Sequence, residues 1–518
     1  MTGAAFPLRR NVAALNGPAY DLLVIGGGIY GAWTAYDAAL RGLKVALIEK
    51  TDWGSGTSQA SSKLIHGGLR YLEHYEFSLV RHALNERRTL AQLAPHLVRP
   101  MNFVIPVWRG ARVGRLKWFA GLTLYDLLAT GQQPVARFRS LSRKQLSAAH
   151  PYLLHTGLRG GLRYGDCQED DARMTLFVVA AAQAAGAVCA NAVSATALLR
   201  ENGRCVGAEL CDQETGARFA LRAACVVNAA GPWARPLAAT IIDNTDLPPV
   251  KLIRGLHLVL PTIPGLDHAF LLTAPDDGRV FFVIPWYGRT LIGTTETAVP
   301  AADAIVDDEP ETHYLLNAVN ALLPGLGWRR EHVISRFAGV RSLLDTASSN
   351  LSATSREFSV HRPLPGLILP LGGKYTTARL DAAQLVEQVF ADLNRPLPPC
   401  RSADQPLPGA PTDFRHWQAD AIAALHSQGV DALCAAQLTQ RHGTGIARIT
   451  ELLRENPAWR QRLHPAAPFI AAEAVLAVRD EMARTVEDVI RRRMPLRLVA
   501  GTPGLEMDFL HSLLPNKG

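Results

Sequence analysis

Residues 20–49 read YDLLVIGGGIYGAWTAYDAALRGLKVALIE, and this stretch decides the fold. The apolar run Leu22–Ile25 ends in three glycines, which predicts a buried strand of a parallel sheet. Alanines at positions 32, 35, 38 and 39 then recur at helical spacing and form a small face that can pack close to a sheet. Gly42 ends this helix, and Lys44–Ile48 is a second apolar strand. The stretch predicts one strand–helix–strand unit of an α/β fold.

The glycines of this unit satisfy the GxGxxG pattern of dinucleotide-binding turns at Gly26, Gly28 and Gly31. The first glycine permits the tight turn, the second lets the backbone approach a pyrophosphate, and the third lets the helix sit against the strand. Glu49 ends the second strand, where a carboxylate can accept hydrogen bonds from ribose hydroxyls. The pattern predicts a nucleotide site without choosing between FAD and NAD. Glu49 argues against NADP, whose 2′-phosphate it would repel.

The bulk composition describes a globular chain. Its 518 residues predict two to four domains, with 48% hydrophobic and 19% charged residues. Seven cysteines form no CxxC pair, which favours reduced thiols and a cytosolic setting over a disulfide framework. The net charge of +8 suits an anionic substrate, cofactor or membrane face, and equally a solvated surface.

Several classes of protein and site find no support in the sequence. It carries no RNA-binding signature, zinc finger, metal-ligand cluster or GxSxG elbow, so we expect no nucleic acid, no metal and no acyl transfer. Apolar runs of about 18 residues are absent, so we expect no transmembrane helix. Residues 1–19 lack the apolar core of a secretion signal, and we expect them to form an arm on the domain that begins at Tyr20.

A second loop follows Glu49 and carries the most specific block of the chain. Residues 51–88 read TDWGSGTSQASSKLIHGGLRYLEHYEFSLVRHALNERR. The small and hydroxyl residues suit a loop wrapped around a cofactor. The alternative is a plain flexible Ser/Gly linker, but such linkers rarely run straight into a sequence like LIHGGLRYLEHY. This chain resembles the FAD-dependent glycerol-3-phosphate dehydrogenases, which are D-amino-acid-oxidase-like flavoproteins. Further matching blocks are YGDCQEDDARMTL, VVNAAGPWA, RVFFVIPWYGRTLIGTTE, AGVRSLL, TSREF and LGGKYTTAR.

The resemblance implies an α/β architecture: a Rossmann-like FAD-binding domain, an antiparallel-sheet substrate domain and a helical C-terminal domain. The expected FAD-binding segments are about 20–80, 150–250 and 335–394, and the substrate-domain segments are about 81–149 and 251–334. The Pro-rich stretch 395–413 is expected to link this body to a helical domain over 414–518. Within it, apolar positions at helical spacing predict one helix across 473–493 (Val475, Val478, Met482, Val486 and Val489).

The resemblance also implies that the cofactor is FAD. It is expected to be bound by two glycine-rich loops, by the end of a strand and by a turn near residue 374. The expected contacts are Gly26, Gly28, Ile29, Tyr30, Gly31, Glu49, Lys50, Thr57, Ser58, Ser61, Ser62, Leu64, His66, Gly67, Val193, Ala230, Gly231, Gly373, Lys374 and Thr376.

The implied reaction oxidises sn-glycerol 3-phosphate to dihydroxyacetone phosphate by hydride transfer from C2 to flavin N5. The hydroxyl proton needs a base, and a histidine, with an ordinary pKa near 6.5, suits this role. His66 and His257 are the candidates, and the sequence leaves the choice open. Lys374 matches a family position that places a positive charge near the flavin or contacts the substrate oxygen.

A phosphate dianion needs cations, and the planar fork of arginine matches its oxygens. Arg341 and Arg356 match the family positions that grip the substrate phosphate. Arg70 and Tyr71 match positions at the edge of the substrate or flavin. These matches imply a phosphorylated polyol as the substrate.

Six residues depart from the family pattern. Tyr30 and Trp33 are expected to place bulky side chains at the mouth of the dinucleotide helix. Ser342 stands where a proline is usual, Glu296 where an aspartate is usual, and Glu357 and Phe358 where Asp and Tyr or His are common. These departures leave open whether the polyol is glycerol 3-phosphate or another phosphate ester, such as a tetritol phosphate.

Residues 110–131 mix arginines and a lysine with Trp118, Phe119 and several leucines. Such a segment is typical of an interfacial anchor, and also of a core-facing helix with a basic side. The resemblance favours peripheral contact with the inner face of the cytoplasmic membrane and a quinone acceptor. The alternatives are an oxidase using O2, a flavin-holding protein without catalysis and a nicotinamide dehydrogenase. Assembly into a homodimer also stays open.

Overall fold

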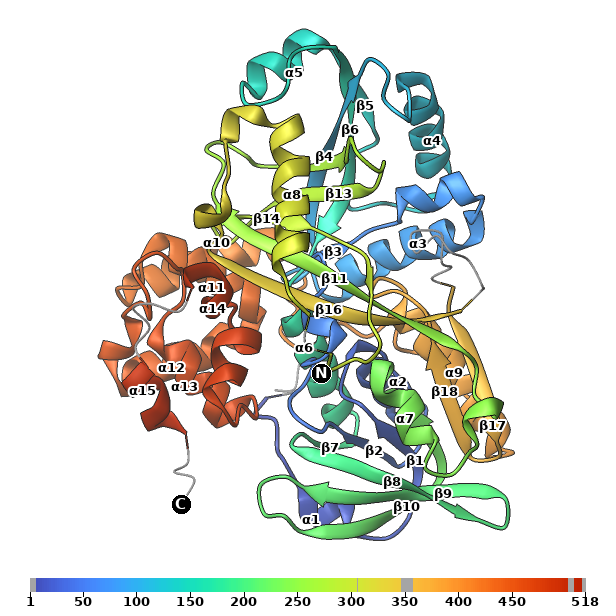
Figure 1. Cartoon of the computed structure of the whole chain (residues 1–518). Coiled ribbons are helices and arrows are strands. Elements are labelled where there is room, and N and C mark those ends of the chain that lie inside the picture. Colours follow the sequence, from blue (N-terminus) through green and yellow to red (C-terminus); the bar gives the residue numbers. More distant parts are fainter. Residues whose placement is uncertain (1–5, 305, 346–356, 502–506, 515–518) are drawn as a thin grey trace.

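Two sheets and a helical domain make up the molecule (Figure 1). The computed structural model describes residues 6–304, 306–345, 357–501 and 507–514. The sheet that contains the N-terminal unit lies below the second sheet in Figure 1, and the C-terminal helices lie to the left of both. The expected α/β architecture with an antiparallel substrate sheet and a helical C-terminal domain is confirmed.

The first sheet is the core of the FAD-binding part. Its main path runs β17 (Ser359–Leu364), β18 (Leu367–Leu371), β10 (Arg218–Asn228), β1 (Tyr20–Ile25), β2 (Val45–Ile48) and β7 (Val188–Ala190). β1 is parallel to both β10 and β2, and its residues 22–24 are fully buried. Helix α2 (Ile29–Leu40) packs between α6 (Asp171–Ala184) and α9 (Ala378–Asp392). The predicted strand–helix–strand unit is confirmed.

An antiparallel pair, β8 (Val193–Glu201) and β9 (Arg204–Asp212), extends from β10.

The second sheet is mostly antiparallel and covers the first. Its path runs β15 (Thr297–Ala298), β11 (Val250–Pro261), β14 (Arg289–Gly293), β13 (Val280–Trp286), β12 (Ala269–Thr273), β4 (Arg99–Trp108), β6 (Leu158–Gln168) and β3 (Leu64–Ile65). β16 (Ser335–Leu344) pairs with β11, and β5 (Arg139–Leu141) pairs with β6. The expected segment bounds differ here, because β3, β6 and β16 fall within the expected FAD-binding segments and instead pair within this sheet.

Helices border the second sheet. They are α3 (Phe77–Leu93), α4 (Arg115–Leu128), α5 (Arg143–Ala149) and α8 (Glu309–Leu322). Within the described ranges, no helix is both long and apolar enough to cross a bilayer.

The C-terminal domain contains α10 (Phe414–Ser427), α11 (Ala432–His442), α12 (Ile446–Glu455), α13 (Ala471–Asp480), a π-helical turn (Asp488–Arg493), α14 (Leu496–Ala500) and α15 (Met507–Leu513). The prediction of one helix across 473–493 is wrong. The chain leaves the helix after Asp480, and Met482 has a φ of 57°. Asn191 donates to the Met482 carbonyl, and Arg493 donates to that of Glu481. These tertiary hydrogen bonds override the helical spacing.

Both segments that flank the FAD-dependent body pack against it. In the arm, Arg10 pairs with Asp212, and the Leu8 amide donates to the Asp480 carbonyl of the C-terminal domain. In the Pro-rich stretch, Ser402 is fully buried and accepts a hydrogen bond from Arg379. These contacts hold the C-terminal domain against the FAD-binding part from two sides. The seven cysteines all lie within the described ranges and are free.

The expectation for Trp33 is wrong. Its side chain is 1% exposed and packs in the core of the FAD-binding part, away from the mouth of the dinucleotide turn. α2 is covered by α6 and α9, so a bulky side chain on this helix is accommodated by packing.

Candidate functional site

A cavity of about 870 Å³ lies between the two sheets. It reaches from the dinucleotide turn to the face of β11 and β16. The predicted site residues that line it are Gly26, Gly28, Ile29, Tyr30, Glu49, Lys50, Thr57, Ser58, Ser61, Ser62, Leu64, His66, Arg70, Tyr71, Val193, Ala230, Gly231, His257, Arg341, Gly373, Lys374 and Thr376. Most of the residues that the sequence singled out are therefore brought together.

Three predicted site residues stand apart from this lining. Gly31 faces the β1 turn, where an added Cβ would lie 1.9 Å from the Gly26 carbonyl oxygen. It therefore serves helix–strand packing, as its place in the pattern requires. Gly67 donates its N–H to the Tyr125 hydroxyl and is not among the residues that line the cavity, so its contact with the cofactor stays a prediction. Arg356 lies outside the described residues.

The dinucleotide end of the cavity is built by backbone groups at the start of α2. The Gly27 N–H donates to Glu49 Oε2 at 2.8 Å, and the Ile29 N–H donates to Ser58 Oγ at 2.9 Å. A Cβ at Gly26 would lie 2.6 Å from the carbonyl oxygen of Ala229, so the ends of β1 and β10 approach closely only because this residue is glycine. A glycine-rich helix N-terminus beside an acidic strand end fits the pyrophosphate and ribose of FAD.

Tyr30 ties this end to the late turn at 373–376. Its hydroxyl donates to Asp381 at 2.5 Å and accepts the N–H of Lys374 at 3.0 Å. Burial raises the pKa of Asp381 to about 6. The bulky residue therefore fixes the backbone of the turn that carries Lys374. The sequence showed Tyr30 as an expected FAD contact and as a departure from the family pattern, and it gave no sign of this link.

A cluster of cations marks the other end of the cavity. Glu296 Oε1 lies 3.7 Å from Arg70 Nη2 and 3.7 Å from Arg341 Nη1. Arg341 also donates to Thr294 Oγ1 at 3.3 Å. Lys374 Nζ lies 3.4 Å from the centroid of the Tyr71 ring. Glu296 lies between the two arginines and holds them together. The sequence indicated Glu296 only as a departure from the family pattern and did not predict this bridging position.

The register of β11 and β16 places His257 beside this cluster. Ile253 pairs with Arg341, Gly255 with Gly339 and His257 with Phe337, so these side chains share one face of the sheet. Because Gly255 has no side chain, the Arg341 guanidinium can lie over it. A Cβ at Gly255 would lie 2.3 Å from Arg341 Nη2. The strand pairing thus places a cation and an imidazole on one face of the sheet, and both line the cavity.

His257 is buried and held on two sides. Its Nε2 lies 2.9 Å from Ser62 Oγ, and its ring lies against Phe337. Burial, followed by the charges of Arg341 and Lys63, places its pKa well below the ordinary value of 6.5. The imidazole is therefore neutral at pH 7 and can accept a proton.

His66 reaches the cavity from the second loop. Its N–H donates to Thr376 Oγ1 at 3.2 Å, and its ring meets Phe282 edge to face at 6.1 Å. The backbone bond joins this loop to the late turn. Both candidate bases thus line the same cavity.

Comparisons with known proteins agree with this arrangement. The family model described as FAD dependent oxidoreductase matches residues 21–378, and one described as the C-terminal domain of alpha-glycerophosphate oxidase matches residues 400–508. A glycerol-3-phosphate dehydrogenase of Synechocystis is 35% identical over 96% of this chain and 92% of its own. A D-erythritol 1-phosphate dehydrogenase of Brucella abortus is 36% identical over 91% and 93% of the two chains.

Among solved structures, the glycerol-3-phosphate dehydrogenase of Bacillus halodurans complexed with FAD superposes with a TM-score of 0.77 at 28% identity. It covers 97% of this chain and 90% of its own.

Proposed function

The chain belongs to the FAD-dependent glycerol-3-phosphate dehydrogenase family, and from that premise we propose that it oxidises sn-glycerol 3-phosphate to dihydroxyacetone phosphate and passes the electrons to a quinone. Its cofactor is FAD, and its substrate class is glycerol 3-phosphate or a related phosphorylated polyol. The finer assignment is supported by one observation: two arginines, bridged by Glu296, lie on the same cavity as a buried neutral histidine.

Arg341 and Arg70 bind the phosphate in this proposal. Their guanidinium groups already converge on one carboxylate, so the substrate meets a preset pair of cations. Two arginines and one glutamate leave a net positive charge at this end of the cavity, which suits a dianion. Arg356 was expected to bind the same phosphate and lies outside the described residues.

His257 accepts the hydroxyl proton at Nε2 in this proposal, beside the Ser62 hydroxyl. The depressed pKa keeps the ring unprotonated at neutral pH, as a base requires. FAD, when bound, supplies the acceptor for the hydride. Lys374, held through the Tyr30 contact, contributes positive charge near the flavin or the substrate oxygen. His66 joins the second loop to the late turn, and it is the alternative base.

The deciding experiment is anaerobic mixing of the purified yellow protein with sn-glycerol 3-phosphate. We expect sn-glycerol 3-phosphate to bleach the visible flavin absorbance, at a rate that saturates with substrate concentration. Glycerol without phosphate should leave the absorbance unchanged. Lack of bleaching by sn-glycerol 3-phosphate would reject this substrate.

A tetritol phosphate is the second candidate, because the Brucella relative named for D-erythritol 1-phosphate is as similar as those named for glycerol 3-phosphate. The same assay with D-erythritol 1-phosphate separates the two. Whichever substrate has the higher kcat/KM is the assigned one.

Contact with a membrane, where a quinone acceptor would lie, is supported by α4, which exposes large apolar side chains beside its cations. Leu116 is 87% exposed and Leu127 is 74% exposed, whereas Leu122 and Tyr125 face the core. The cations Arg112 and Lys117 both pair with Glu73, which reduces their attraction to anionic lipid. We therefore expect the apolar side chains to contribute most of the membrane affinity. Turnover with a soluble quinone, without peroxide production, would separate this acceptor from O2.

A further inference from the structure

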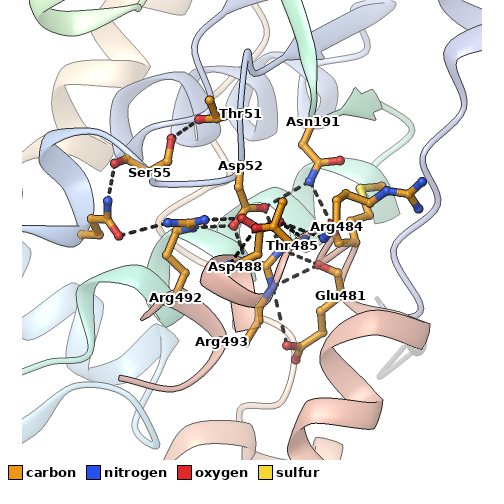
Figure 2. A network of polar contacts seen from close by, with 12 residues as sticks. Thr51, Asp52, Ser55, Asn191, Glu481, Arg484, Thr485, Asp488, Arg492 and Arg493 are labelled. Carbon is orange, nitrogen blue, oxygen red and sulfur yellow. Dashed lines mark hydrogen bonds and ion pairs between the residues drawn. The ribbon is translucent and has the colours of Figure 1, made fainter. Parts of the chain in front are cut away.

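Three consecutive arginines of the C-terminal domain, Arg491–Arg493, reach into the FAD-binding part. Asp52 lies between the last two, Arg492 and Arg493, and is fully buried (Figure 2). Its Oδ2 is 2.6 Å from Arg492 Nε and 2.6 Å from Arg493 Nη1, and its Oδ1 is 2.8 Å from Arg493 Nη2. Burial alone would raise the pKa of Asp52, but Arg493 and Arg492 lower it to about 2. The carboxylate is therefore ionised and depends on these two arginines.

A second anchor lies seven residues further along the chain, at Gln59. Its carbonyl oxygen accepts hydrogen bonds from Arg491 Nη2 at 3.3 Å and from Lys63 Nζ at 2.7 Å. Its side-chain oxygen accepts one from Arg492 Nη1 at 3.4 Å. Asp52 and Gln59 bound a segment that we call the flavin loop, residues 52–59. Both ends of this loop are held by one short turn of the C-terminal domain.

The flavin loop forms part of the cofactor cavity. Its residues 55–58 line the cavity, and Ser58 Oγ accepts the Ile29 N–H at the start of α2. The Thr57 hydroxyl donates to the carbonyl of Val340, next to Arg341. A displacement of the loop would therefore change the dinucleotide turn and the strand that carries the phosphate-binding arginine.

We propose that Arg492 and Arg493 position the flavin loop, so that the C-terminal domain is a working part of the FAD site and FAD binding is coupled to the docking of this domain. The physical reason is the cost of an uncompensated buried carboxylate, which makes the loop conformation dependent on the arginines. Coupling of this kind is reciprocal, so bound FAD stabilises the docked turn as much as the turn favours FAD. The proposal concerns cofactor binding and holds whichever polyol is oxidised.

The first test is titration of FAD into the full-length apoprotein, followed by flavin fluorescence. Arg492→Met removes one partner of Asp52, and we expect FAD to bind about tenfold more weakly or worse. Arg492→Lys keeps the positive charge but lacks the planar guanidinium group. We expect this variant to bind FAD with intermediate affinity.

The matched control is Arg484→Met. Arg484 also crosses from the C-terminal domain to the FAD-binding part, where its side chain pairs with Glu214, outside the flavin loop. We expect its FAD affinity to stay within about twofold of the native value, since a partly exposed pair contributes little. Equal FAD affinity of Arg492→Met and the native protein would overturn the proposal, as would an equal loss in Arg484→Met.

The second test needs no variant and therefore does not depend on the folding of one. Amide hydrogen exchange of the native chain is compared with and without FAD. We expect FAD to slow exchange of the Asp488–Arg493 turn at least as much as that of the flavin loop, while α10, remote from Asp52, keeps its rate. If FAD did not change the exchange rate of the Asp488–Arg493 turn, the proposed coupling would be wrong.

Discussion

The imidazole of His257 lies flat against the phenyl ring of Phe337, with centroids 4.9 Å apart and planes inclined by 7°. The two residues face each other across β11 and β16. On Phe337, the guanidinium of Arg491 also lies 5.3 Å from the ring centroid. The candidate base is thus held by an aromatic side chain that the C-terminal domain itself contacts.

Phe337→Leu should keep the site apolar but remove the flat surface that fixes the imidazole. We expect kcat to fall about tenfold, because a loosely held base loses alignment with the hydroxyl proton. The KM for substrate should change little, since the arginines are untouched. Steady-state kinetics at saturating FAD measures both, and an unchanged kcat would show that the stack does not orient the base.

His257→Gln should remove the base while keeping a polar side chain of similar reach. We expect kcat to fall about a hundredfold or more at pH 7, with an unchanged flavin spectrum. His66→Gln is the matched variant, and it should lose less activity. A larger loss in His66→Gln would assign the base to that residue instead.

The pH profile of the native protein tests the same assignment. The pKa of His257 lies below 6.5, because burial, Arg341 and Lys63 all disfavour the protonated ring. The active form is unprotonated, so kcat/KM should be flat at neutral pH and fall on acidification only below 6.5. An acid limb centred above 6.5 would be inconsistent with His257 as the base.

Gly255→Ala should displace Arg341. The added Cβ would lie 2.3 Å from Arg341 Nη2 and 2.5 Å from Thr294 Oγ1. We expect the KM for the phosphorylated substrate to rise about tenfold or more, as phosphate contacts are lost. Gly121→Ala on α4 meets no atom within 4 Å and serves as the control with native kinetics. Native KM in Gly255→Ala would mean that the arginine position is not required.

Leu116→Glu should weaken binding to lipid vesicles. Replacing an 87% exposed leucine on α4 removes apolar contact and adds charge repulsion, so we expect about tenfold weaker co-sedimentation with anionic vesicles. Leu397→Glu alters a leucine that is 51% exposed in the Pro-rich stretch, and it should bind vesicles like the native protein. Equal loss in both variants, or no vesicle binding by the native protein, would argue against an anchor at α4.

Acid should destabilise the chain through His96. This side chain is fully buried against Phe177, and in the described part of the chain neither ring nitrogen has a hydrogen-bond partner. Burial, then Arg173 and His442, lower its pKa from 6.5 to about 3. Between these values the unfolded state binds the extra proton, so stability is present above 6.5 and is lost as the pH falls toward 3.

At pH 5 this single group should cost about 2 kcal/mol of the free energy of unfolding. His96→Leu removes the titration, so its loss of stability between pH 7 and pH 5 should be smaller by that amount. Urea denaturation at the two pH values measures the difference. An identical pH dependence in the variant would exclude His96 as the acid-sensitive group.

The local patterns of the sequence predicted the parts of the fold that are local in origin. Gly26, Gly28 and Gly31 fix a turn whose geometry depends on a few neighbouring residues, so the strand–helix–strand unit followed directly. The break after Asp480 depends instead on Asn191, which is remote in the chain, so apolar spacing alone indicated a helix.

The site shows the same division. His257 and Arg341 were identified as motif residues, but their common face depends on the register between β11 and β16. Phe337 beneath the imidazole carries no sequence signal, and Glu296 is visible in the sequence only as a departure from the family pattern. Their places follow from that register and from a loop conformation. Trp33 was misplaced because the neighbours of α2 come from α6 and α9, distant in the chain.

The pairing of Asp52 with Arg492 and Arg493 joins positions 440 and 441 residues apart. During translation, Asp52 therefore leaves the ribosome long before Arg492 and Arg493 do. Domains tend to fold as they emerge, so the nascent FAD-binding part first folds around an unmatched carboxylate. FAD would then bind well only to chains that include Arg492 and Arg493. A messenger RNA with a premature stop codon before Arg492 would yield chains that bind little FAD.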